Sequence, residues 1–398
     1  MSLPTTHTVA GRRAVRAALA DLPPGAPLVV GCSGGTDSLA LVACLAAELG
    51  LRPVPDGRAA DGAAPDARSV PTALPAAPAR PARPVRVVVV DHGMQAGSAA
   101  VAELAAATCR RLGLPTDVVR VVVDGPGGPE AAARAARYAA LGAALDALPG
   151  GADGAILLGH TLDDQAEGVL LGLARGAGAR SLAGMRPVRG RVRRPLLGLS
   201  GSATAGVCAE QGLEPWHDPT NTPAPDDDTA PRRSALRTRV LPLLTEVLGP
   251  GVVPALARTA AQLREDDDAL TSYAERLLAD ATVPDATVPD ATSPDATSPD
   301  ATSPDATVPD VVDTAPALSR APRLDCATLA AAPAAVRRRA LRAWAVSIGA
   351  TDGALSRTHV LALDALVAAW RGQGPLPLPG RVTVARRCGT LEGHSPAP

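Results

Sequence analysis

Short apolar runs alternate with amphipathic segments along the first part of the chain. The apolar runs predict strands at about 27–32, 85–90, 118–123 and 155–159. The amphipathic pattern predicts helices at about 8–20, 37–49, 98–112 and 130–147, with another starting near 163. Continuous Val- and Leu-rich strands separated by helices are typical of a parallel sheet covered on both faces. The sequence therefore predicts an α/β fold with a doubly wound parallel sheet, in which ligands bind at the carboxyl ends of the strands.

Two segments interrupt this pattern. Residues 52–84 are rich in Pro, Ala, Arg and Asp without a period, and residues 281–310 are six tandem copies of Ala-Thr-Val/Ser-Pro-Asp. Such segments bury little apolar surface, so we expect a disordered insertion and a disordered spacer.

After residue 240 the pattern is helical, at 241–244, 253–279, 333–346 and 357–371, with a strand expected at 381–387. We expect a nucleotide-binding domain at 1–240 and a smaller, mainly helical region at 241–280 and 314–398.

Composition narrows the class of protein. The chain has 398 residues and a net charge of −1, with no Phe and no Lys, so Arg supplies every fixed positive side chain. Without the six Asp of the repeats, the rest of the chain carries +5. Arg residues gather at 186–194, 232–239 and 337–342. Each cluster is compatible with a solvated face or with nucleic-acid binding.

The six cysteines, at 32, 44, 109, 208, 326 and 388, form no CxxC pair, and no membrane-length apolar stretch or signal peptide is visible. We therefore expect a reduced, cytoplasmic enzyme that does not use a membrane.

The segment Ser33-Gly34-Gly35-Thr36-Asp37-Ser38 joins the first predicted strand to the following helix. Glycines let backbone N–H groups approach oxyanions, and the helix N-terminus adds a positive dipole. A carboxylate in such a loop would repel phosphate, so Asp37 suits a bound Mg²⁺. A plain strand-to-helix turn is the alternative. The segment resembles the loop of pyrophosphate-loop ATPases, which implies cleavage of ATP between the α and β phosphates and adenylation of a substrate.

Three further segments follow predicted strands or lie on the helix between them. Asp91, His92 and Gly93 end the second strand, where backbone groups could hold adenine, or simply turn the chain. Glu130 and Arg134 share a helical face, either as an internal salt bridge or to present Arg134 to phosphates. His160 follows the fourth strand, and Asp164 and Glu167 then share one face of a helix that Asp163 could cap. These acids could hold a metal or an amine.

Six segments occur in the order typical of the tRNA(Ile)-lysidine synthetase family, which the chain resembles from about 25 to 245. They are SGGTDS at 33–38, VDHGMQ at 90–95, EAAARAARY at 130–138, GHTLDDQAEGVLLGLARGAGARSLAGM at 159–185, RPLLGLS at 194–200 and WHDPTN at 216–221.

The resemblance implies that ATP adenylates the C2 oxygen of the wobble cytidine in a CAU-anticodon tRNA(Ile), and that L-lysine then displaces AMP. It also implies roles for individual residues. Ser33, Gly34, Gly35, Thr36, Asp37 and Ser38 hold ATP phosphates and Mg²⁺, with Asp91, His92 and Gly93 also contacting the nucleotide. Arg134 and His160 lie near ATP or the adenylate. Asp164 and Glu167 recognise lysine amines, and Asp164 shares the metal with Asp37.

Other readings stay open at this point. Another tRNA-modifying or small-molecule adenylating enzyme of the same superfamily is the main alternative, for example a cytidine thiolase or an amidotransferase-like synthetase. The first would use paired cysteines and the second an ammonia source, and the sequence suggests neither. A nucleotide-binding regulator would have no need to keep Asp37, His160, Asp164 and Glu167 together. A homodimer is an assembly compatible with the sequence.

Overall fold

A computed structural model describes residues 6–51, 83–95, 97–125, 128–176, 178–218, 231–283 and 322–394. The chain divides into two compact units, Met1–Arg264 and Glu265–Pro398, and each is described by itself. The expected insertion at 52–84 lies outside the described residues except for 83 and 84, and most of the repeat segment lies outside them too.

The first unit is built on a six-stranded sheet in the order β3-β2-β1-β4-β6-β5. Its strands are β1 (Leu28–Cys32), β2 (Val85–Asp91), β3 (Thr116–Arg120), β4 (Ala155–Leu158), β5 (Val188–Arg189) and β6 (Val192–Arg193). All pairings are parallel except the antiparallel hairpin of β5 with β6. The predicted doubly wound sheet is therefore confirmed, although β3 begins at Thr116 and ends at Arg120, slightly earlier than the expected 118–123.

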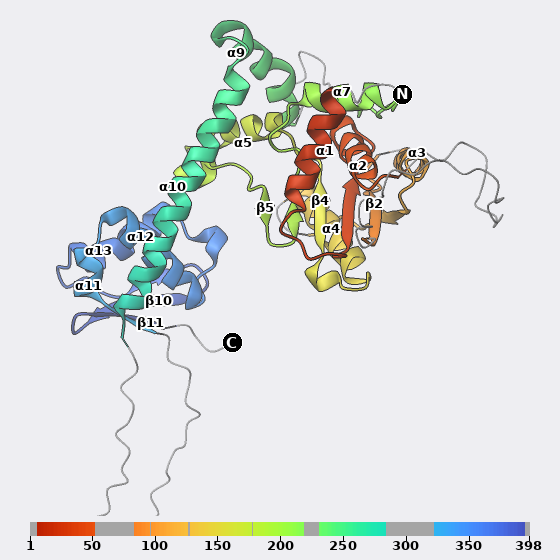
Figure 1. Cartoon of the computed structure of the whole chain (residues 1–398). Coiled ribbons are helices and arrows are strands. Elements are labelled where there is room, and N and C mark those ends of the chain that lie inside the picture. The colour runs from red at the N-terminus through yellow and green to blue at the C-terminus, as the bar shows by residue number, and fades with distance from the viewer. Residues whose placement is uncertain are drawn as a thin grey trace, which may run out of the picture. The chain divides into compact units, whose positions relative to one another are not determined.

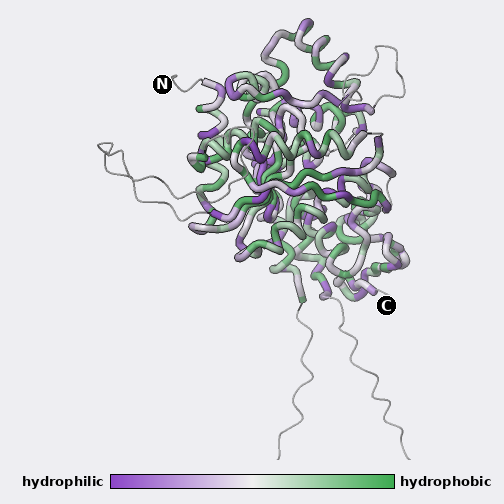
Figure 2. Tube along the Cα trace, turned by 90° about the vertical axis from the view of Figure 1, so that its right-hand side faces the viewer, coloured by the Kyte–Doolittle hydropathy of each residue, from purple (hydrophilic) through white to green (hydrophobic). Residues whose placement is uncertain are grey.

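Helices cover both faces of this sheet (Figure 1). Helices α1 (Thr6–Ala18), α2 (Thr36–Glu48), α3 (Ser98–Arg111) and α7 (Gly201–Glu210) share one apolar core with the sheet. Helix α4 (Pro129–Asp146) packs on the opposite face through Leu141 and Leu145. Hydrophobic residues, green in Figure 2, run along the strands and along the helix sides that meet them. Helix α2 is buried over most of its length because it lies between the sheet, α1 and α7.

The first unit continues beyond the sheet through short helical elements. These are η1 (Gly151–Asp153), α5 (Leu162–Ala174), α6 (Ala179–Leu182), α8 (Arg232–Ala235), the π-helical turn η3 (Leu236–Val240), α9 (Leu241–Leu248) and the start of α10 (Val252–Ala281). The unit extends past the boundary expected at 240, because Arg264 of α10 donates hydrogen bonds to the carbonyls of Ala183 and Met185. The sequence analysis did not anticipate α7.

The second unit combines helices with a five-stranded antiparallel sheet in the order β7-β8-β11-β10-β9. The elements are β7 (Thr282–Val283), β8 (Arg323–Asp325), α11 (Cys326–Ala331), α12 (Ala334–Ser347), η4 (Asp352–Ala354), α13 (Arg357–Ala368), β9 (Leu376–Leu378), β10 (Val382–Arg387) and β11 (Thr390–His394). Trp344, on α12, is 1% exposed in the core between helices and sheet. Helices α12 and α13 and strand β10 match the sequence prediction, whereas the short helix α11 was not predicted. The remaining strands were missed because three of them have only two or three residues.

The start of the repeat segment corrects the expected spacer. Ala281 ends α10 and is buried, and Thr282 and Val283 pair with Leu324 and Arg323 of β8. The first repeat is therefore ordered at its beginning, because its Ala fits the core of the second unit and its β-branched residues fit a strand.

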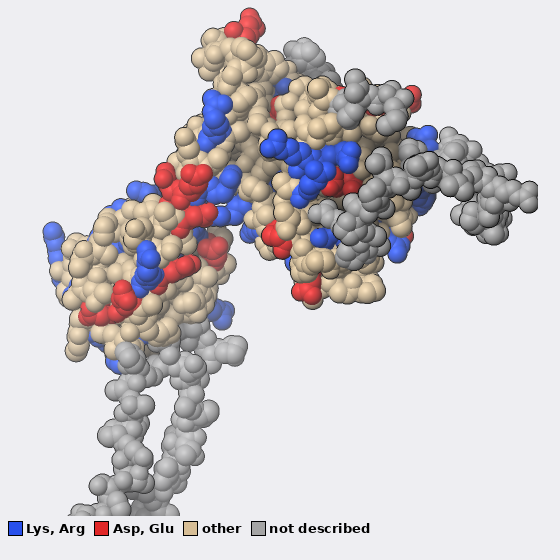
Figure 3. Space-filling model, viewed as in Figure 1, with Lys and Arg blue, Asp and Glu red and all other residues tan. Residues whose placement is uncertain are grey.

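Many of the clustered arginines form ion pairs within their own unit. In the second unit, Arg337 and Arg338 both bind Asp364, Arg339 binds Asp267, and Arg342 binds Asp352. In the first, Arg191 pairs with Asp146, and Arg193 pairs with Asp21. Blue and red side chains accordingly lie next to one another on the face drawn in Figure 3. The arginines that pair in this way form contacts within their own unit, a role that neither the solvated-face nor the nucleic-acid interpretation proposed.

Within the described residues, no single helix combines the length and apolarity needed to cross a membrane. The bent pair Arg232–Leu248 and Val252–Ala281 meets those limits only when its two parts are taken together.

Candidate nucleotide-binding and ligation site

The loop after β1 is closed by its own serines. The Ser38 hydroxyl donates to the carbonyl of Gly35 at 2.9 Å and accepts the N–H of Ser33 at 3.1 Å. Gly34 has φ of +81°, and a Cβ there would lie 2.9 Å from the Cβ of Ala105. Both the backbone conformation and the close approach to α3 therefore require glycine. The result is a tight loop that leads into the N-terminus of α2, as the sequence predicts for a phosphate cradle.

Asp37 lies in the first turn of α2, beside the end of β4. A Cβ on Gly159 would lie 2.7 Å from the carbonyl oxygen of Asp37, so glycine permits this close approach. Thr204 of α7 donates its hydroxyl to Oδ1 of Asp37 at 2.5 Å. Burial raises the pKa of Asp37; the hydrogen bond from Thr204 opposes this, and the charge of Asp164 adds to it. A bound cation would offset both the burial of the Asp37 carboxylate and its repulsion by Asp164. This carboxylate therefore suits the role of a metal ligand.

The end of β2 forms a turn held by its own aspartate. Asp91 is 5% exposed, and its Oδ1 accepts the N–H of Gly93 at 2.9 Å. Hydrogen bonds from the side chain of Ser98 and from this N–H lower the pKa of Asp91. The Asp91 carboxylate therefore fixes the turn, while His92 and the Gly93 backbone line the cavity described below.

Arg134 lies on α4 and contacts Tyr138 rather than Glu130. Its guanidinium donates to the Tyr138 hydroxyl at 3.1 Å and lies 5.0 Å from the ring centroid. No ion pair joins Arg134 to Glu130 in the part of the chain that the structure describes. The proposed internal salt bridge is therefore wrong, and Arg134 faces the cavity together with Arg137.

His160 is a neutral side chain at neutral pH. Burial lowers its pKa to about 4, against the influence of Asp164, and nearby arginines lower it further. Its Nδ1 is buried and has no hydrogen-bond partner among the described residues. A neutral imidazole without an internal partner is available to hydrogen-bond a ligand.

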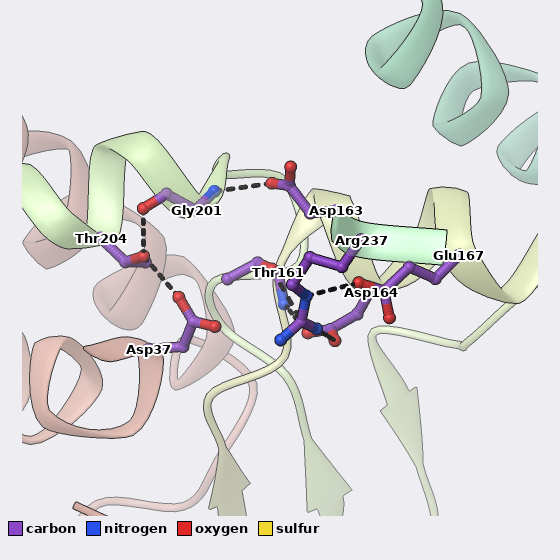
Figure 4. Close-up of polar contacts among 8 residues, drawn as sticks. All are labelled: Asp37, Thr161, Asp163, Asp164, Glu167, Gly201, Thr204 and Arg237. Atoms are coloured by element: carbon purple, nitrogen blue, oxygen red, sulfur yellow. Dashed lines mark hydrogen bonds and ion pairs between the residues drawn. The ribbon is translucent and has the colours of Figure 1, made fainter. Parts of the chain in front are cut away.

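Helix α5 starts with a capping box that uses Asp164 rather than Asp163. The N–H of Thr161 donates to Oδ2 of Asp164 at 2.8 Å, and the Thr161 side chain accepts from the backbone at the third helical position. Asp163 instead accepts the N–H of Gly201 at the start of α7, at 2.6 Å (Figure 4). The expectation that Asp163 caps its own helix is thus wrong, and this acid links α5 to α7.

Arg237 bridges the two acids that share one face of α5. Its Nε donates to Oε1 of Glu167 at 2.8 Å, and its NH2 group donates to Oδ1 of Asp164 at 3.4 Å (Figure 4). Glu167 is 0% exposed, and its Oε2 has no partner among the described residues. Burial raises the pKa of Glu167, while the hydrogen bond and charge of Arg237 oppose the shift.

These strand ends surround one cavity of about 820 Å³, a size that suits a nucleotide-sized ligand. Nearly all residues that the resemblance assigns to the site line it; Gly34 and Glu167 do not. Those that do are Ser33, Gly35, Thr36, Asp37, Ser38, Asp91, His92, Gly93, Arg134, His160 and Asp164. Arg137, Trp216, Arg233 and Arg237 also line the cavity. Sequence reasoning named the arginines only within motifs or clusters, and it missed Thr204, which sits in a helix without a motif.

A parallel sheet with this glycine-rich loop and a cavity at its carboxyl edge defines an ATPase of the pyrophosphate-loop class. Residues 11–244 match the family model described as a PP-loop domain, and residues 324–391 match the TilS substrate binding domain. A tRNA(Ile)-lysidine synthase of Leifsonia xyli subsp. xyli is 44% identical, over 94% of this chain and 91% of the relative. That of Nocardia farcinica is 43% identical, over 97% of this chain and 99% of the relative. The chain belongs to the tRNA(Ile)-lysidine synthase family.

A structural comparison gives a more distant similarity. The U34-tRNA thiolase NcsA from Methanococcus maripaludis has a TM-score of 0.46 and 17% identity, covering 65% of this chain and 80% of that chain.

The contact between Thr204 and Asp37 generates a prediction about ATP. We expect Thr204→Val, which keeps the shape but removes the hydroxyl, to weaken ATP binding in the presence of Mg²⁺ by about tenfold, since a hydrogen bond to a charged group contributes roughly 1.5–3 kcal/mol. Thr204→Ser keeps the donor and is the matched control. Calorimetric titration with ATP measures both. Equal ATP affinity of the Val and Ser variants would show that Asp37 is positioned without Thr204.

Proposed function

We propose that the enzyme joins L-lysine to C2 of the wobble cytidine of CAU-anticodon tRNA(Ile), forming lysidine through an adenylated tRNA and releasing AMP and pyrophosphate. The observation that carries this proposal is the cavity at which the loop of Asp37 meets Asp164 of α5, in a chain whose relatives over nearly its full length are tRNA(Ile)-lysidine synthases. Those relatives favour lysidine synthesis over another adenylating activity of the superfamily.

The phosphate loop and the N-terminus of α2 would hold the ATP phosphates. Gly35 and Thr36 of this loop line the cavity, and so do Arg134 and Arg137 of α4. Two arginines facing an anion supply the charge that the triphosphate needs. Neutral His160 can donate to an oxygen of ATP or of the adenylate without adding net charge.

Asp37 and Asp164 are the residues that fit Mg²⁺. Both carboxylates line the cavity, and the charge of Asp164 contributes to the raised pKa of Asp37. No donor among the described residues reaches Oδ2 of Asp37, which leaves that oxygen for a cation. Bound Mg²⁺ would neutralise charge on the departing pyrophosphate.

Adenylation is needed because the C2 oxygen of cytidine is a poor leaving group. In the proposed first step this oxygen attacks the α-phosphorus of ATP and pyrophosphate departs. In the second, a lysine amine attacks C2, and the bond from C2 to oxygen breaks as AMP leaves. The cavity brings the two reactants together, and this proximity supplies much of the rate acceleration.

Asp164 and Glu167 would recognise the cationic amine groups of lysine. In this structure the Arg237 guanidinium donates hydrogen bonds to both Asp164 and Glu167. Arg237 lines the cavity, whereas Glu167 does not. An ammonium ion approaching from the cavity can therefore reach Glu167 only when Arg237 moves aside. The unpartnered Oε2 of Glu167 leaves one acceptor for the incoming amine.

The same proposal includes the cellular compartment, the residues that contact tRNA and the assembly of the protein. All six cysteines are free thiols, which fits a reducing cytoplasm. We assign tRNA contact to residues 241–280 and 314–398. The part of the repeat segment 281–310 that follows β7 would act as a spacer. A homodimer stays a prediction.

The activity is tested by incubating the protein with ATP, Mg²⁺, radiolabelled lysine and a CAU-anticodon tRNA(Ile) transcript. We expect label in the tRNA and one AMP formed per lysine incorporated, because the leaving group is adenylate. A transcript with uridine at the wobble position is the control and should stay unlabelled. Formation of ADP instead of AMP, or label in neither RNA, would refute the proposed function.

The role of the buried acid is tested with Glu167→Gln. We expect the KM for lysine to rise by about one to two decades, since a charge-assisted hydrogen bond contributes roughly 1.5–3 kcal/mol. Pyrophosphate release without lysine should persist, because ATP and Mg²⁺ do not depend on this residue. Exposed Glu103 on α3 provides the matched control Glu103→Gln. An unchanged KM for lysine combined with loss of pyrophosphate release would place Glu167 at the metal instead.

A further inference from the structure

Two buried thiols, those of Cys32 and Cys109, lie next to each other at the start of the phosphate loop. Cys32 is the last residue of β1, and Cys109 lies on α3, which packs beside it. Their sulfur atoms are 3.7 Å apart, and the two side chains are 4% and 0% exposed. A disulfide bond needs the sulfurs at about 2.05 Å, so a small movement of α3 toward β1 would join them.

The Cys32 sulfur has three polar neighbours, two of which belong to the phosphate loop. Its Sγ accepts the N–H of Gly34 at 3.4 Å and lies 3.6 Å from the hydroxyl of Ser38, while the thiol of Cys109 donates from the other side. The bond from Cys109 lowers the pKa of Cys32 against the effect of burial, and the loop donors add to the lowering. The same bond and burial raise the pKa of Cys109. Because Cys32 lines the cavity and Cys109 donates its thiol proton toward it, we take Cys32 as the nucleophile of the pair and Cys109 as its neighbour.

The cavity provides a route to one of the two sulfurs. Cys32 lines the cavity, whereas Cys109 is not among its described lining residues. Two other buried thiols of this unit behave differently: burial raises the pKa of Cys44 to about 12 and that of Cys208 to about 11, and neither lines the cavity. A small reagent entering the nucleotide cavity would thus meet Cys32 first.

We propose that Cys32 and Cys109 form a reversible thiol-oxidation site for hydroperoxides, located in the floor of the ATP cavity. The Cys32 thiolate attacks a peroxide oxygen, the O–O bond breaks, and Cys32 becomes a sulfenic acid while hydroxide leaves. The Cys109 sulfur then attacks the Cys32 sulfur, a disulfide forms, and the sulfenic oxygen departs as water with the Cys109 proton. The peroxide is reduced and the thiol pair is oxidised.

Oxidation at this position would act on the loop itself. A Cys32 sulfur drawn toward Cys109 removes the acceptor of the Gly34 N–H and ends the contact with the Ser38 hydroxyl. The loop that binds phosphate would lose two of the contacts that shape it, so the oxidised protein should bind ATP weakly. Bound ATP should in turn shield Cys32 from peroxide.

The test uses the full chain carrying Cys388→Ser, which removes the one exposed thiol. This protein is treated with hydrogen peroxide, with and without ATP, then denatured, alkylated and analysed by mass spectrometry. We expect loss of two free thiols, a Cys32–Cys109 linked peptide, and ATP affinity lowered roughly tenfold or more. Dithiothreitol should restore both thiols and ATP affinity, and ATP present during treatment should slow the loss.

Two further variants separate a specific site from general damage. With Cys109→Ser, which keeps a hydroxyl donor beside Cys32, ATP binding before oxidation should be normal, and peroxide should give a Cys32 sulfenic acid that dimedone traps, with no disulfide. Cys326→Ala removes a buried thiol of the second unit and should behave as the parent. A disulfide joining other cysteines, unchanged ATP affinity after the Cys32–Cys109 link forms, or no dimedone adduct in Cys109→Ser would overturn the proposal. Because thiol loss and ATP binding are measured directly, this test does not depend on lysidine formation.

Discussion

The parallel pairing of β1 with β2 and β4 is the constraint on which the site depends. Gly31 pairs with Val88 on one side and with Leu158 on the other, so three strands end side by side at the same edge. The phosphate loop, the Asp91 turn and the segment from His160 to Asp164 are therefore neighbours, although long stretches of sequence separate them. Gly159 tightens this arrangement, because any side chain there would collide with the backbone of Asp37. A displaced β4 would separate the carboxylates from the loop.

The carboxylates at this edge have internal partners before any ligand binds. Asp37, Asp164 and Glu167 are clustered carboxylates, two of which have pKa values raised mainly by burial. Arg237 compensates two of these acids, and Thr204 supports the third with a neutral hydrogen bond. Cationic ligands would replace these internal partners rather than enter an uncompensated acidic pocket. In the free enzyme, the internal partners lower the free-energy cost of burying several carboxylates.

The sequence was most informative where local pattern and chemistry coincide. The Val-rich strands and the SGGTDS loop predicted the parallel sheet and the residues at its edge, because strand ends in such a sheet must meet. It could not place Thr204, since a Thr within an unremarkable helix carries no signal until α7 packs against α2. The sequence also could not show that Arg237, one of several arginines at 232–239, forms ion pairs with Glu167 and Asp164. The short strands of the second unit gave no periodic signal, because two or three residues cannot show alternation.

The most direct test of the adenylation chemistry follows one oxygen atom. The CAU-anticodon tRNA(Ile) is prepared with oxygen-18 at C2 of its wobble cytidine and converted in ordinary water with ATP and lysine. If the C2 oxygen attacks the α-phosphorus, breaking the bond from C2 to that oxygen transfers the isotope to the phosphate of AMP, and mass spectrometry of AMP should detect it. AMP without the isotope, accompanied by lysine-modified tRNA, would contradict the account.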